Sequence, residues 1–328
     1  MIRHINDHKM KKQITAFLIS TVMVLSLSGC AITGVTSSSP PAVSAAINIP
    51  ASTAGMTHAI GLAGVSNARD IGGYKTADGK TVRAGMLIRT GELINANDAD
   101  KNTLTDTYNV KTIIDLRYDS EIAQSPELTL PGATNIHIPI LKDILASSSS
   151  TKESHTASSS AKLDKLDILI GYVKSIGDVN NTINNGYISM VTDDYSINGY
   201  KKFFDTILSS HNGAIVYHCS GGKDRTGVAS MLLLSALSVD RKTAEDDYML
   251  TYDFIKSSID MTVIGAADKG ASKDVQNGIK LVMGVDRKWA DSVFDSINTK
   301  YGSMDNFLKV KLDLTPDKIK QLKQIYLQ

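Results

Sequence analysis

The residues best suited to chemistry in this 328-residue chain lie in one stretch, 214–227, which reads AIVYHCSGGKDRTG. Cys219 is followed six positions later by Arg225, and Gly221 and Gly222 stand between them. Apolar residues come before the cysteine and after the last glycine, so the pattern predicts a strand, a tight loop and a helix. The backbone N–H groups of such a loop and of the helix N-terminus together make a binding site for an anion.

The residue types of this loop suit the transfer of a phosphoryl group. Cys219 begins the loop, where the N–H dipoles favour its thiolate and make it a nucleophile. Arg225 can hold two phosphate oxygens at once, and the hydroxyl of Thr226 can donate to the thiolate. The residues expected to bind the phosphate are Ser220, Gly221, Gly222, Lys223 and Thr226.

The loop sequence HCSGGKDRTG resembles the active-site loop of the protein tyrosine phosphatase superfamily. It is most similar to a bacterial branch with a Lys-Asp-Arg loop, whose members resemble atypical tyrosine and dual-specificity phosphatases that also act on phosphoinositides. Two further segments support this resemblance. Residues 67–73 (NARDIGG) resemble the Asn-Phe-Arg-Asp motif of the branch except at Ala68, and residues 115–117 resemble its Asp-Leu-Arg motif. The resemblance extends from about residue 60 to the C-terminus.

The resemblance implies a tyrosine-phosphatase-like α/β fold and a two-step reaction through a cysteinyl-phosphate intermediate. It implies neither a cofactor nor a metal, and the sequence itself has no His, Asp and Glu cluster with metal-ligand spacing. The expected substrates are phosphotyrosine or phosphoserine/threonine proteins, and phosphoinositides as a further class.

The general acid that protonates the leaving group has two main candidates. The only tryptophan, Trp289, lies far downstream of the loop, which excludes the Trp-Pro-Asp motif used by many superfamily members. Asp115 ends an apolar strand, and the carboxyl ends of parallel strands share one crevice with the loop, so Asp115 is favoured. Asp224, inside the loop, is the second candidate. Other possibilities are Asp193 and Asp194, or a structural ion pair of either main candidate with Arg117 or Arg69.

Three further residues have two interpretations each. Lys223 adds positive charge at the mouth of the site, which would suit multiply phosphorylated substrates, or it is an ordinary solvated lysine. Arg69 contacts the substrate, or it belongs to a turn at Gly72 and Gly73 that braces the loop. His218 acts as a base or braces the loop, and the brace is favoured because strand alternation points it away from Cys219.

The elements that must position these residues form an α/β pattern with a largely parallel central sheet and a helical C-terminal third. The strand candidates are 86–89, 112–116, 135–140 and 214–218, and the C-terminal helix candidates are 248–260, 274–283, 287–300 and 316–327. An additional amphipathic helix is expected at 166–176. It either packs on the core or acts as a movable lid over the site.

The N-terminal region predicts an exported lipoprotein. Residues 1–29 read as a signal peptide with a bacterial lipobox, Leu-Ser-Gly-Cys, which implies lipidation of Cys30 and retention at the outer face of a bacterial membrane. Residues 30–58 read as a flexible tether, and 59–328 as the catalytic domain with a Ser-rich insertion at 147–160. Lipidation of Cys30 leaves Cys219 as the single free thiol.

The overall composition excludes some functions and leaves others open. Thirty-five basic and 34 acidic residues give a net charge of +1, and aromatic residues make up 6%, so a nucleic-acid partner is not expected. Two alternatives to a phosphatase are a catalytically weak phosphate-binding surface lipoprotein on the same fold, and sulfur or arsenate chemistry. A thiol cascade for arsenate reduction needs more cysteines than this chain has.

Overall fold

A computed structural model describes residues 58–143, 164–210 and 212–328. The predicted signal peptide, Cys30, all of the tether except its last residue, and the Ser-rich insertion lie outside the described residues.

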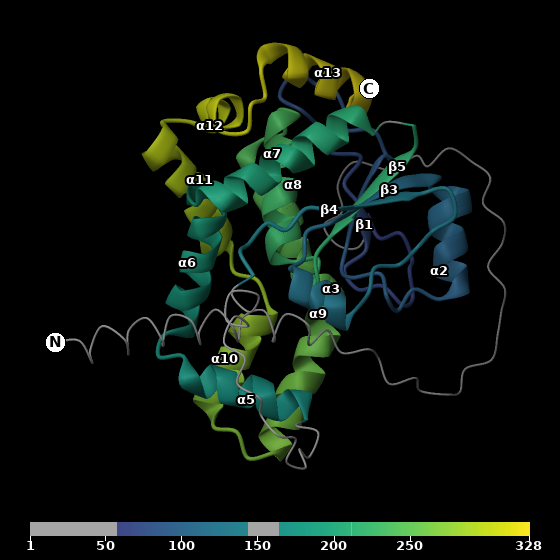
Figure 1. The fold of residues 1–328 in the computed structure, drawn as a ribbon. Coiled ribbons are helices and arrows are strands. Elements are labelled where there is room, and N and C mark those ends of the chain that lie inside the picture. Colours follow the sequence, from purple (N-terminus) through teal and green to yellow (C-terminus); the bar gives the residue numbers. More distant parts are fainter. Residues whose placement is uncertain (1–57, 144–163, 211) are drawn as a thin grey trace, which may run out of the picture.

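A five-stranded sheet forms the centre of the fold, with the strands in the order β1-β2-β5-β3-β4 (Figure 1). Only the β1/β2 pair is antiparallel, and the other neighbours are parallel. This arrangement confirms the predicted α/β class. The strands are β1 (Arg69–Asp70), β2 (Leu87–Thr90), β3 (Val110–Asp115), β4 (Thr134–His137) and β5 (Ala214–His218).

Helices cover both faces of the sheet because the residues of its central strand are apolar on both sides. All five residues of β5 are buried. Ile215 and Tyr217 join a large apolar cluster with helices α7 and α8, whereas Val216 joins a second cluster that includes Leu104. The helices covering the first face include α6 (Val179–Thr192), α7 (Asp194–Ser209), α8 (Asp224–Ala236) and α11 (Arg287–Tyr301). The second face is covered by α2 (Asp98–Asn102) and a short π-helix, Thr103–Thr107.

The register places the ends of three strands together. The last residue of β5, His218, pairs with Thr90 of β2 on one side and with Asp115 of β3 on the other. The chain leaves β5 directly into Cys219, so the predicted nucleophile lies at the carboxyl edge of the sheet between its two neighbours. Helix α3 (Asp119–Gln124) begins just beyond the end of β3.

Most predicted elements are present with small shifts at their ends. Residues 214–218 form β5 as expected, whereas the strand predicted at 135–140 ends earlier, at His137. The helix predicted at 248–260 is much longer, because α9 begins at Arg241, where Asp240 caps it, and continues to Asp268. The remaining C-terminal helices are α10 (Lys273–Met283), α12 (Met304–Val310) and α13 (Pro316–Tyr326).

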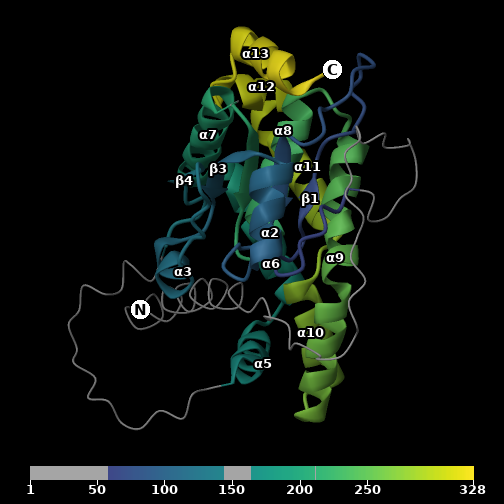
Figure 2. The ribbon, with the colours of Figure 1, turned by 90° about the vertical axis from the view of Figure 1, so that its right-hand side faces the viewer.

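The helix expected at 166–176 is confirmed as α5 (Lys165–Ser175). It packs with α10 and the distal part of α9 in a third apolar cluster, which we call the distal cluster: Leu169, Ile170, Tyr172, Val173, Ile176, Ala266, Ala271, Val275 and Ile279. Figures 1 and 2 show α5, α10 and the end of α9 projecting together from one end of the molecule, opposite α12 and α13. None of the helices described is long and apolar enough to cross a membrane.

Candidate active site

The loop from Cys219 to Lys223 connects β5 to helix α8, as the sequence pattern predicts. Its sharpest point is Gly222, whose φ of +60° favours glycine. A Cβ atom at Gly222 would lie 2.3 Å from the carbonyl oxygen of Thr90, so the loop and the end of β2 are in close contact. The Gly222 carbonyl accepts hydrogen bonds from Asn67 Nδ2 at 2.7 Å and from Arg89 Nη2 at 2.9 Å. The loop is therefore fixed to the sheet by side chains from outside it.

Cys219 is free and has only 1% of its surface exposed. It is a member of the large apolar cluster, next to the end of the sheet. A substrate phosphate therefore has to reach a thiol that is covered in this conformation.

Arg225 is fully buried and is held by a carboxylate that the sequence analysis missed. Its Nη1 and Nη2 donate to the two oxygens of Glu121 at 2.6 and 2.9 Å, and the ring of Tyr118 lies 4.9 Å from its guanidinium. The hydroxyl of Ser220 donates to Glu121 at 2.6 Å. Burial would lower the pKa of Arg225, but the negative charges of Glu121 and Cys219 outweigh it and keep that pKa well above its usual value. The bidentate pair fixes the plane of the guanidinium.

The sequence offered only a weak signal for Glu121. It stands 104 residues before Arg225, and its carboxylate accepts a bond from the backbone N–H of Tyr118 in a capping box at the start of α3. The spacing of that box predicts a helix start, not a partner for the loop.

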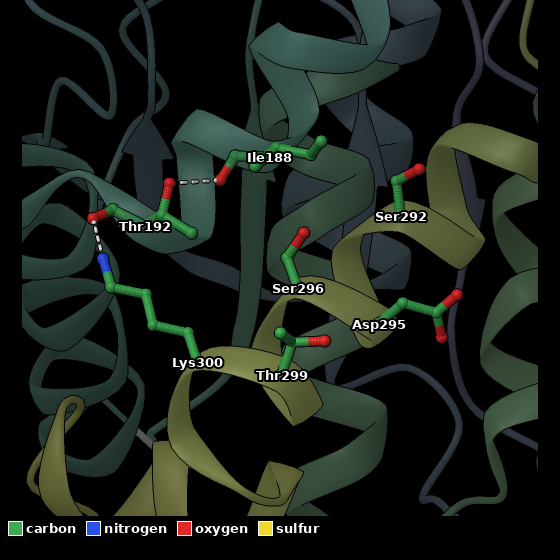
Figure 3. A pocket seen from close by; sticks show the side chains of 7 residues that line it. All are labelled: Ile188, Thr192, Ser292, Asp295, Ser296, Thr299 and Lys300. Atoms are coloured by element: carbon green, nitrogen blue, oxygen red, sulfur yellow. Dashed lines mark hydrogen bonds between the residues drawn. The ribbon is translucent and has the colours of Figure 1, made fainter.

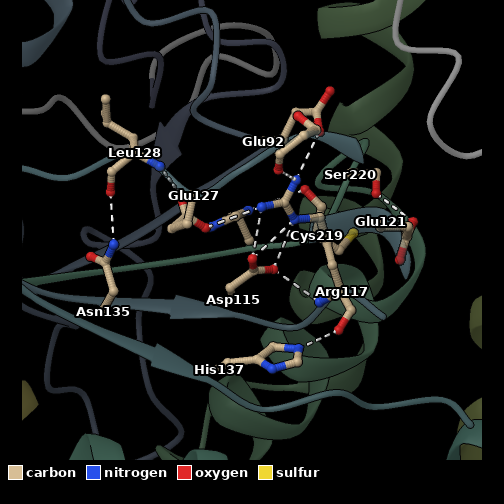
Figure 4. Close-up of polar contacts among 12 residues, drawn as sticks. Glu92, Asp115, Arg117, Glu121, Glu127, Leu128, Asn135, His137, Cys219 and Ser220 are labelled. Carbon is tan, nitrogen blue, oxygen red and sulfur yellow. Dashed lines mark hydrogen bonds and ion pairs between the residues drawn. The ribbon is translucent and has the colours of Figure 1, made fainter. Parts of the chain in front are cut away.

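Asp115, the first candidate for the general acid, lies in the structural ion pair that was its alternative role (Figure 4). Arg117 donates to it from the backbone N–H at 2.9 Å, from Nε at 3.0 Å and from Nη2 at 2.8 Å. Burial would raise the pKa of Asp115, but the charges of His218 and Arg117 outweigh burial and lower it below its usual value. An ionised carboxylate bound in this way has no proton to give to a leaving group.

Arg117 also binds two other carboxylates and completes a buried ionic network (Figure 4). Its Nη1 donates to Glu92 at 3.0 Å, and Glu127 lies within 3.4 Å of Nη2. His218 Nε2 lies 2.6 Å from Glu127, whereas its other ring nitrogen faces the Cys219 carbonyl rather than the thiol. The predicted brace is thus built from β3, β5 and the segment after α3.

Folding brings Asp115, Glu127 and His218 close enough together for one ligand atom of each to reach the same metal ion. The spacing of these residues in the sequence did not reveal this cluster. Burial alone would lower the pKa of His218, but Asp115 and Glu127 raise it to about 9. A protonated imidazole is not a metal ligand, and the Arg117 guanidinium already binds the two carboxylates. The cluster therefore has the chemistry of an ion-pair network.

Asp224, the second candidate acid, is the first residue of α8 and is 3% exposed. The hydroxyl of Tyr187 donates to its Oδ1, and Lys223 Nζ lies 3.6 Å from the same oxygen. Lys223 is thus an ion-pair partner of Asp224, at a longer distance than the 2.8 Å that separates Arg117 from Asp115.

Lys223 is neither a solvated lysine nor a free positive charge at the mouth of the site in this structure. It is not a solvated lysine, because only 7% of it is exposed. Its ammonium donates to the carbonyl of Val282 at 2.7 Å, in the last turn of α10. The positive charge of the loop therefore stabilises the negative end of a helix dipole in this conformation.

Arg69 braces the loop and does not face a substrate. It is fully buried and donates to Asp247 Oδ1 at 3.1 Å and to the Asp247 carbonyl at 2.8 Å. Its Nη1 donates to Asn67, which in turn binds the loop carbonyls. The donors of Arg69 thus go to α9 and Asn67 in this structure, which favours the bracing interpretation over contact with a phosphate.

Thr226 also departs from its expected role. Its hydroxyl is buried and makes no hydrogen bond to any of the residues the structure describes, so it does not donate to the Cys219 thiol in this conformation.

A shallow hollow of about 340 Å³ lies elsewhere, between α6 and α11 (Figure 3). In it, Lys300 donates to the Thr192 carbonyl at 2.8 Å, and Thr192 donates to the Ile188 carbonyl at 2.8 Å. None of the residues predicted to act on phosphate lines it. The candidate site is therefore the loop itself.

Three known proteins that are similar in sequence to this chain are all named as phosphatases. A protein of Cupriavidus necator assigned as a tyrosine-protein phosphatase is 27% identical over 80% of this chain and 86% of its own length. The triple specificity protein phosphatase PtpB of Mycobacterium tuberculosis is 24% identical over 76% of this chain and 92% of its own. A tyrosine-protein phosphatase of Nostoc commune is 26% identical over 74% of each chain.

The family match covers all the strands and helices described above. Residues 60–328 match the tyrosine phosphatase family, from before β1 to the last residue of the chain, including the loop with Cys219 and Arg225. The chain belongs to the tyrosine phosphatase family.

Proposed function

We propose that this protein is a cysteine-dependent phosphomonoester hydrolase that needs no metal ion and works through a cysteinyl-phosphate intermediate. The observation that carries the proposal is the loop itself: Cys219 follows the central strand, and Arg225 is fixed by Glu121 and lies beside Ser220. Preorganised donors around one anion position are the main requirement of phosphoryl transfer.

In the first step, the Cys219 sulfur attacks phosphorus, the S–P bond forms, and the bond from phosphorus to the leaving oxygen breaks. Arg225 and the loop N–H groups bind the phosphoryl oxygens as charge develops on them. The leaving oxygen takes a proton from a general acid. In the second step, water attacks phosphorus, the S–P bond breaks, and the water proton returns to the same carboxyl group. Phosphate leaves and the thiolate is restored.

Asp224 is our choice for the acid. Asp115 is bound on both oxygens by Arg117, and its pKa is below the usual value, whereas Asp224 lies in the loop beside Arg225. This reverses the preference drawn from strand ends alone.

The substrates we propose are phosphotyrosine and phosphoserine/threonine proteins, with phosphoinositides as a second class. The name of the Mycobacterium tuberculosis relative, a triple specificity protein phosphatase, supports a range wider than phosphotyrosine. Lys223 is the loop residue whose positive charge can bind a second phosphate group. To do so, its ammonium group must first break its hydrogen bond to the Val282 carbonyl. This role would be refuted if the ratio of phosphoinositide turnover to phosphotyrosine turnover were the same in Lys223→Met as in the wild type.

We also propose that α5, with α10, forms a lid. Lys223 of the loop binds the end of α10. The pKa of Tyr172 in α5 lies above its usual value, mainly because Tyr172 is buried and to a smaller extent because Tyr118 is near. Cys219 is covered in this state, so opening is required for substrate entry.

Export and anchoring through Cys30 are proposed from the lipobox alone. A Cys30→Ala variant is expected to move from the membrane fraction to the soluble fraction. Unchanged membrane retention of Cys30→Ala would contradict the anchor.

The activity is tested by hydrolysis of para-nitrophenyl phosphate by the full-length protein purified in detergent, in the presence of EDTA. Cys219→Ser is expected to lower kcat by on the order of a thousandfold or more, because it removes the nucleophile. Equal rates in the two proteins would end the enzyme proposal and leave the phosphate-binding lipoprotein as the alternative. Loss of wild-type activity in EDTA would contradict independence from metal.

A further inference from the structure

A chain of hydrogen bonds between two buried tyrosines ends on Asp224. Tyr248 of α9 donates its hydroxyl to the hydroxyl oxygen of Tyr187 at 2.8 Å, and Tyr187 of α6 donates to Asp224 Oδ1. Helices α6, α8 and α9 therefore contribute to the surroundings of one carboxyl group.

The direction of the chain is fixed by chemistry. The carboxylate of Asp224 can only accept, so the single proton of Tyr187 points to Asp224, and the Tyr187 oxygen accepts the proton of Tyr248. Burial raises the pKa of both tyrosines well above the usual value, and the charge of Asp224 raises them further. Both hydroxyls therefore keep their protons across the working range of an enzyme.

This direction determines which oxygen of Asp224 can hold a transferable proton. Oδ1 accepts the Tyr187 proton, and the carbonyl oxygen of a carboxylic acid is a better acceptor than its hydroxyl oxygen, so the acid proton is favoured on Oδ2. Turning the carboxyl group over would break its bond to Tyr187.

The Tyr187 ring is held as firmly as its hydroxyl. It stacks on Trp289 of α11 with ring centroids 5.6 Å apart, and it meets the edge of Tyr248 at 5.8 Å. Trp289 Nε1 donates to Asn180 at 2.8 Å. Gly227 of α8 leaves room for Tyr248, because a Cβ atom there would lie 2.9 Å from that ring. Tyr187 is 1% exposed and Tyr248 is fully buried.

We propose that Tyr187 is a positioning residue for the general acid: its hydroxyl holds the Asp224 carboxyl so that Oδ2 delivers the proton to the leaving oxygen. The inference rests on the proposed phosphatase reaction and assigns a role that the sequence motifs did not contain. Tyr187 is not expected to touch the substrate, and it keeps its own proton throughout.

Other charged and titratable groups also surround Asp224. They are Lys223 of the loop, Arg225 of α8, Tyr118 before α3, Tyr200 of α7 and Tyr248 of α9. In a Tyr187→Phe variant, Tyr248 loses the hydroxyl that accepts its proton, so a change seen in that variant reports the loss of the whole hydrogen-bond chain to Asp224.

The experiment compares two substrates that differ in their need for an acid. Para-nitrophenol leaves readily without a proton, whereas phenol does not, so kcat for phenyl phosphate reports the acid. In Tyr187→Phe, kcat for phenyl phosphate is expected to fall about tenfold, while kcat for para-nitrophenyl phosphate changes by less than about threefold.

Tyr326→Phe is the matched control. Tyr326 is an equally buried tyrosine whose hydroxyl donates to the Ile207 carbonyl at 2.8 Å, away from the loop. Its variant should leave the ratio of the two kcat values unchanged. Asp224→Asn should lower the phenyl phosphate rate more than either tyrosine variant.

The outcomes separate the two levels of the proposal. If the wild type is active and Tyr187→Phe has the same kcat ratio as Tyr326→Phe, the positioning role is overturned and the phosphatase proposal stands. A wild type no faster than Cys219→Ser would instead end the phosphatase proposal. If Tyr187→Phe fails to fold by circular dichroism, Tyr248→Phe tests the same chain, and it should shift the ratio in the same direction by a smaller factor. An unchanged ratio there would overturn the proposal.

Discussion

Individual side chains in the site act mainly by holding one another. Arg225 is paired on two nitrogens with Glu121 and covered by Tyr118, so a fully buried positive charge is compensated before any phosphate binds. A guanidinium fixed in this way loses little freedom when it binds the substrate. Asp115 and Arg117 neutralise each other in the same manner behind the loop.

Replacing Glu121 by Gln should therefore damage catalysis more than its distance from phosphorus suggests. The amide cannot accept two charged bonds, so kcat/KM for para-nitrophenyl phosphate is expected to fall by about 10- to 100-fold. Glu245→Gln is the control, because Glu245 is comparably buried but pairs with the half-exposed Arg241 away from the loop. A Glu121→Gln enzyme within twofold of that control would contradict the role of the pair.

His218 should make folding stability depend on alkaline pH. Its pKa of about 9 in the folded protein is above its ordinary 6.5, because Asp115 and Glu127 outweigh the effect of burial. Its contribution is therefore complete below about pH 6.5 and is lost as the pH rises through 9. Between pH 6 and 9.5 the free energy of unfolding in urea should fall by roughly 1–3 kcal/mol more in the wild type than in His218→Gln. Parallel pH profiles of the two proteins would exclude this contribution.

At the scale of elements, the loop is held by segments that lie far from it in the sequence, both before and after it. Its Gly222 carbonyl binds Asn67, just before β1, and Arg89 of β2, and Arg89 is paired with Asp247 of α9 at 2.6 Å. The pKa of Asp247 lies below its usual value, because the charges of Arg69 and Arg89 outweigh the effect of burial. A strand edge, the loop and the long helix therefore form one connected brace.

Gly222→Ala should break this brace. Its φ of +60° and the 2.3 Å contact with Thr90 leave no room for a methyl group, so the free energy of unfolding should fall by about 2 kcal/mol or more. Gly221→Ala is the control, because a Cβ atom at Gly221 would lie 3.8 Å from the Lys223 side chain, which is an ordinary contact. Its loss should stay within about 1 kcal/mol. Similar losses in the two variants, measured by urea unfolding, would show that the loop relaxes at Gly222.

At the scale of the molecule, the described residues pack in three apolar clusters, and the smallest, the distal cluster, is the one that lies apart from the sheet. Figure 2 shows its helices extending beyond the rest of the molecule. A small satellite cluster has less burial to lose on opening than a central core, which is the property that a lid requires.

Loosening this cluster should expose the nucleophile. Ile279 is fully buried in α10, and Ile279→Ala is expected to raise the rate of Cys219 alkylation by iodoacetamide several-fold, because local opening becomes easier. Leu322→Ala makes a similar cavity in α13, within the large cluster, and serves as the control. Mass spectrometry of the Cys219 peptide gives the rate. Equal acceleration in both variants would indicate global unfolding and contradict a lid.

The sequence by itself determined the loop, the sheet and the family resemblance. Residues 214–227 form strand, loop and helix as predicted, because an apolar strand, adjacent glycines and a helix start are local signals that need no distant partner. The ends of β5 and α5 were predicted to within one residue for the same reason, because the signals that set them are local.

Only the tertiary structure decided which side chains serve the loop. Glu121 reaches Arg225 across 104 residues, Tyr187 reaches Asp224 across 37, and Asp115 is bound by Arg117 instead of facing the leaving group. Helical spacing tells which face of a helix is buried but not which residue it will meet, because partners depend on how whole helices are packed on the sheet. The charge on each carboxyl group follows from those partners, so the choice of acid had to wait for the fold.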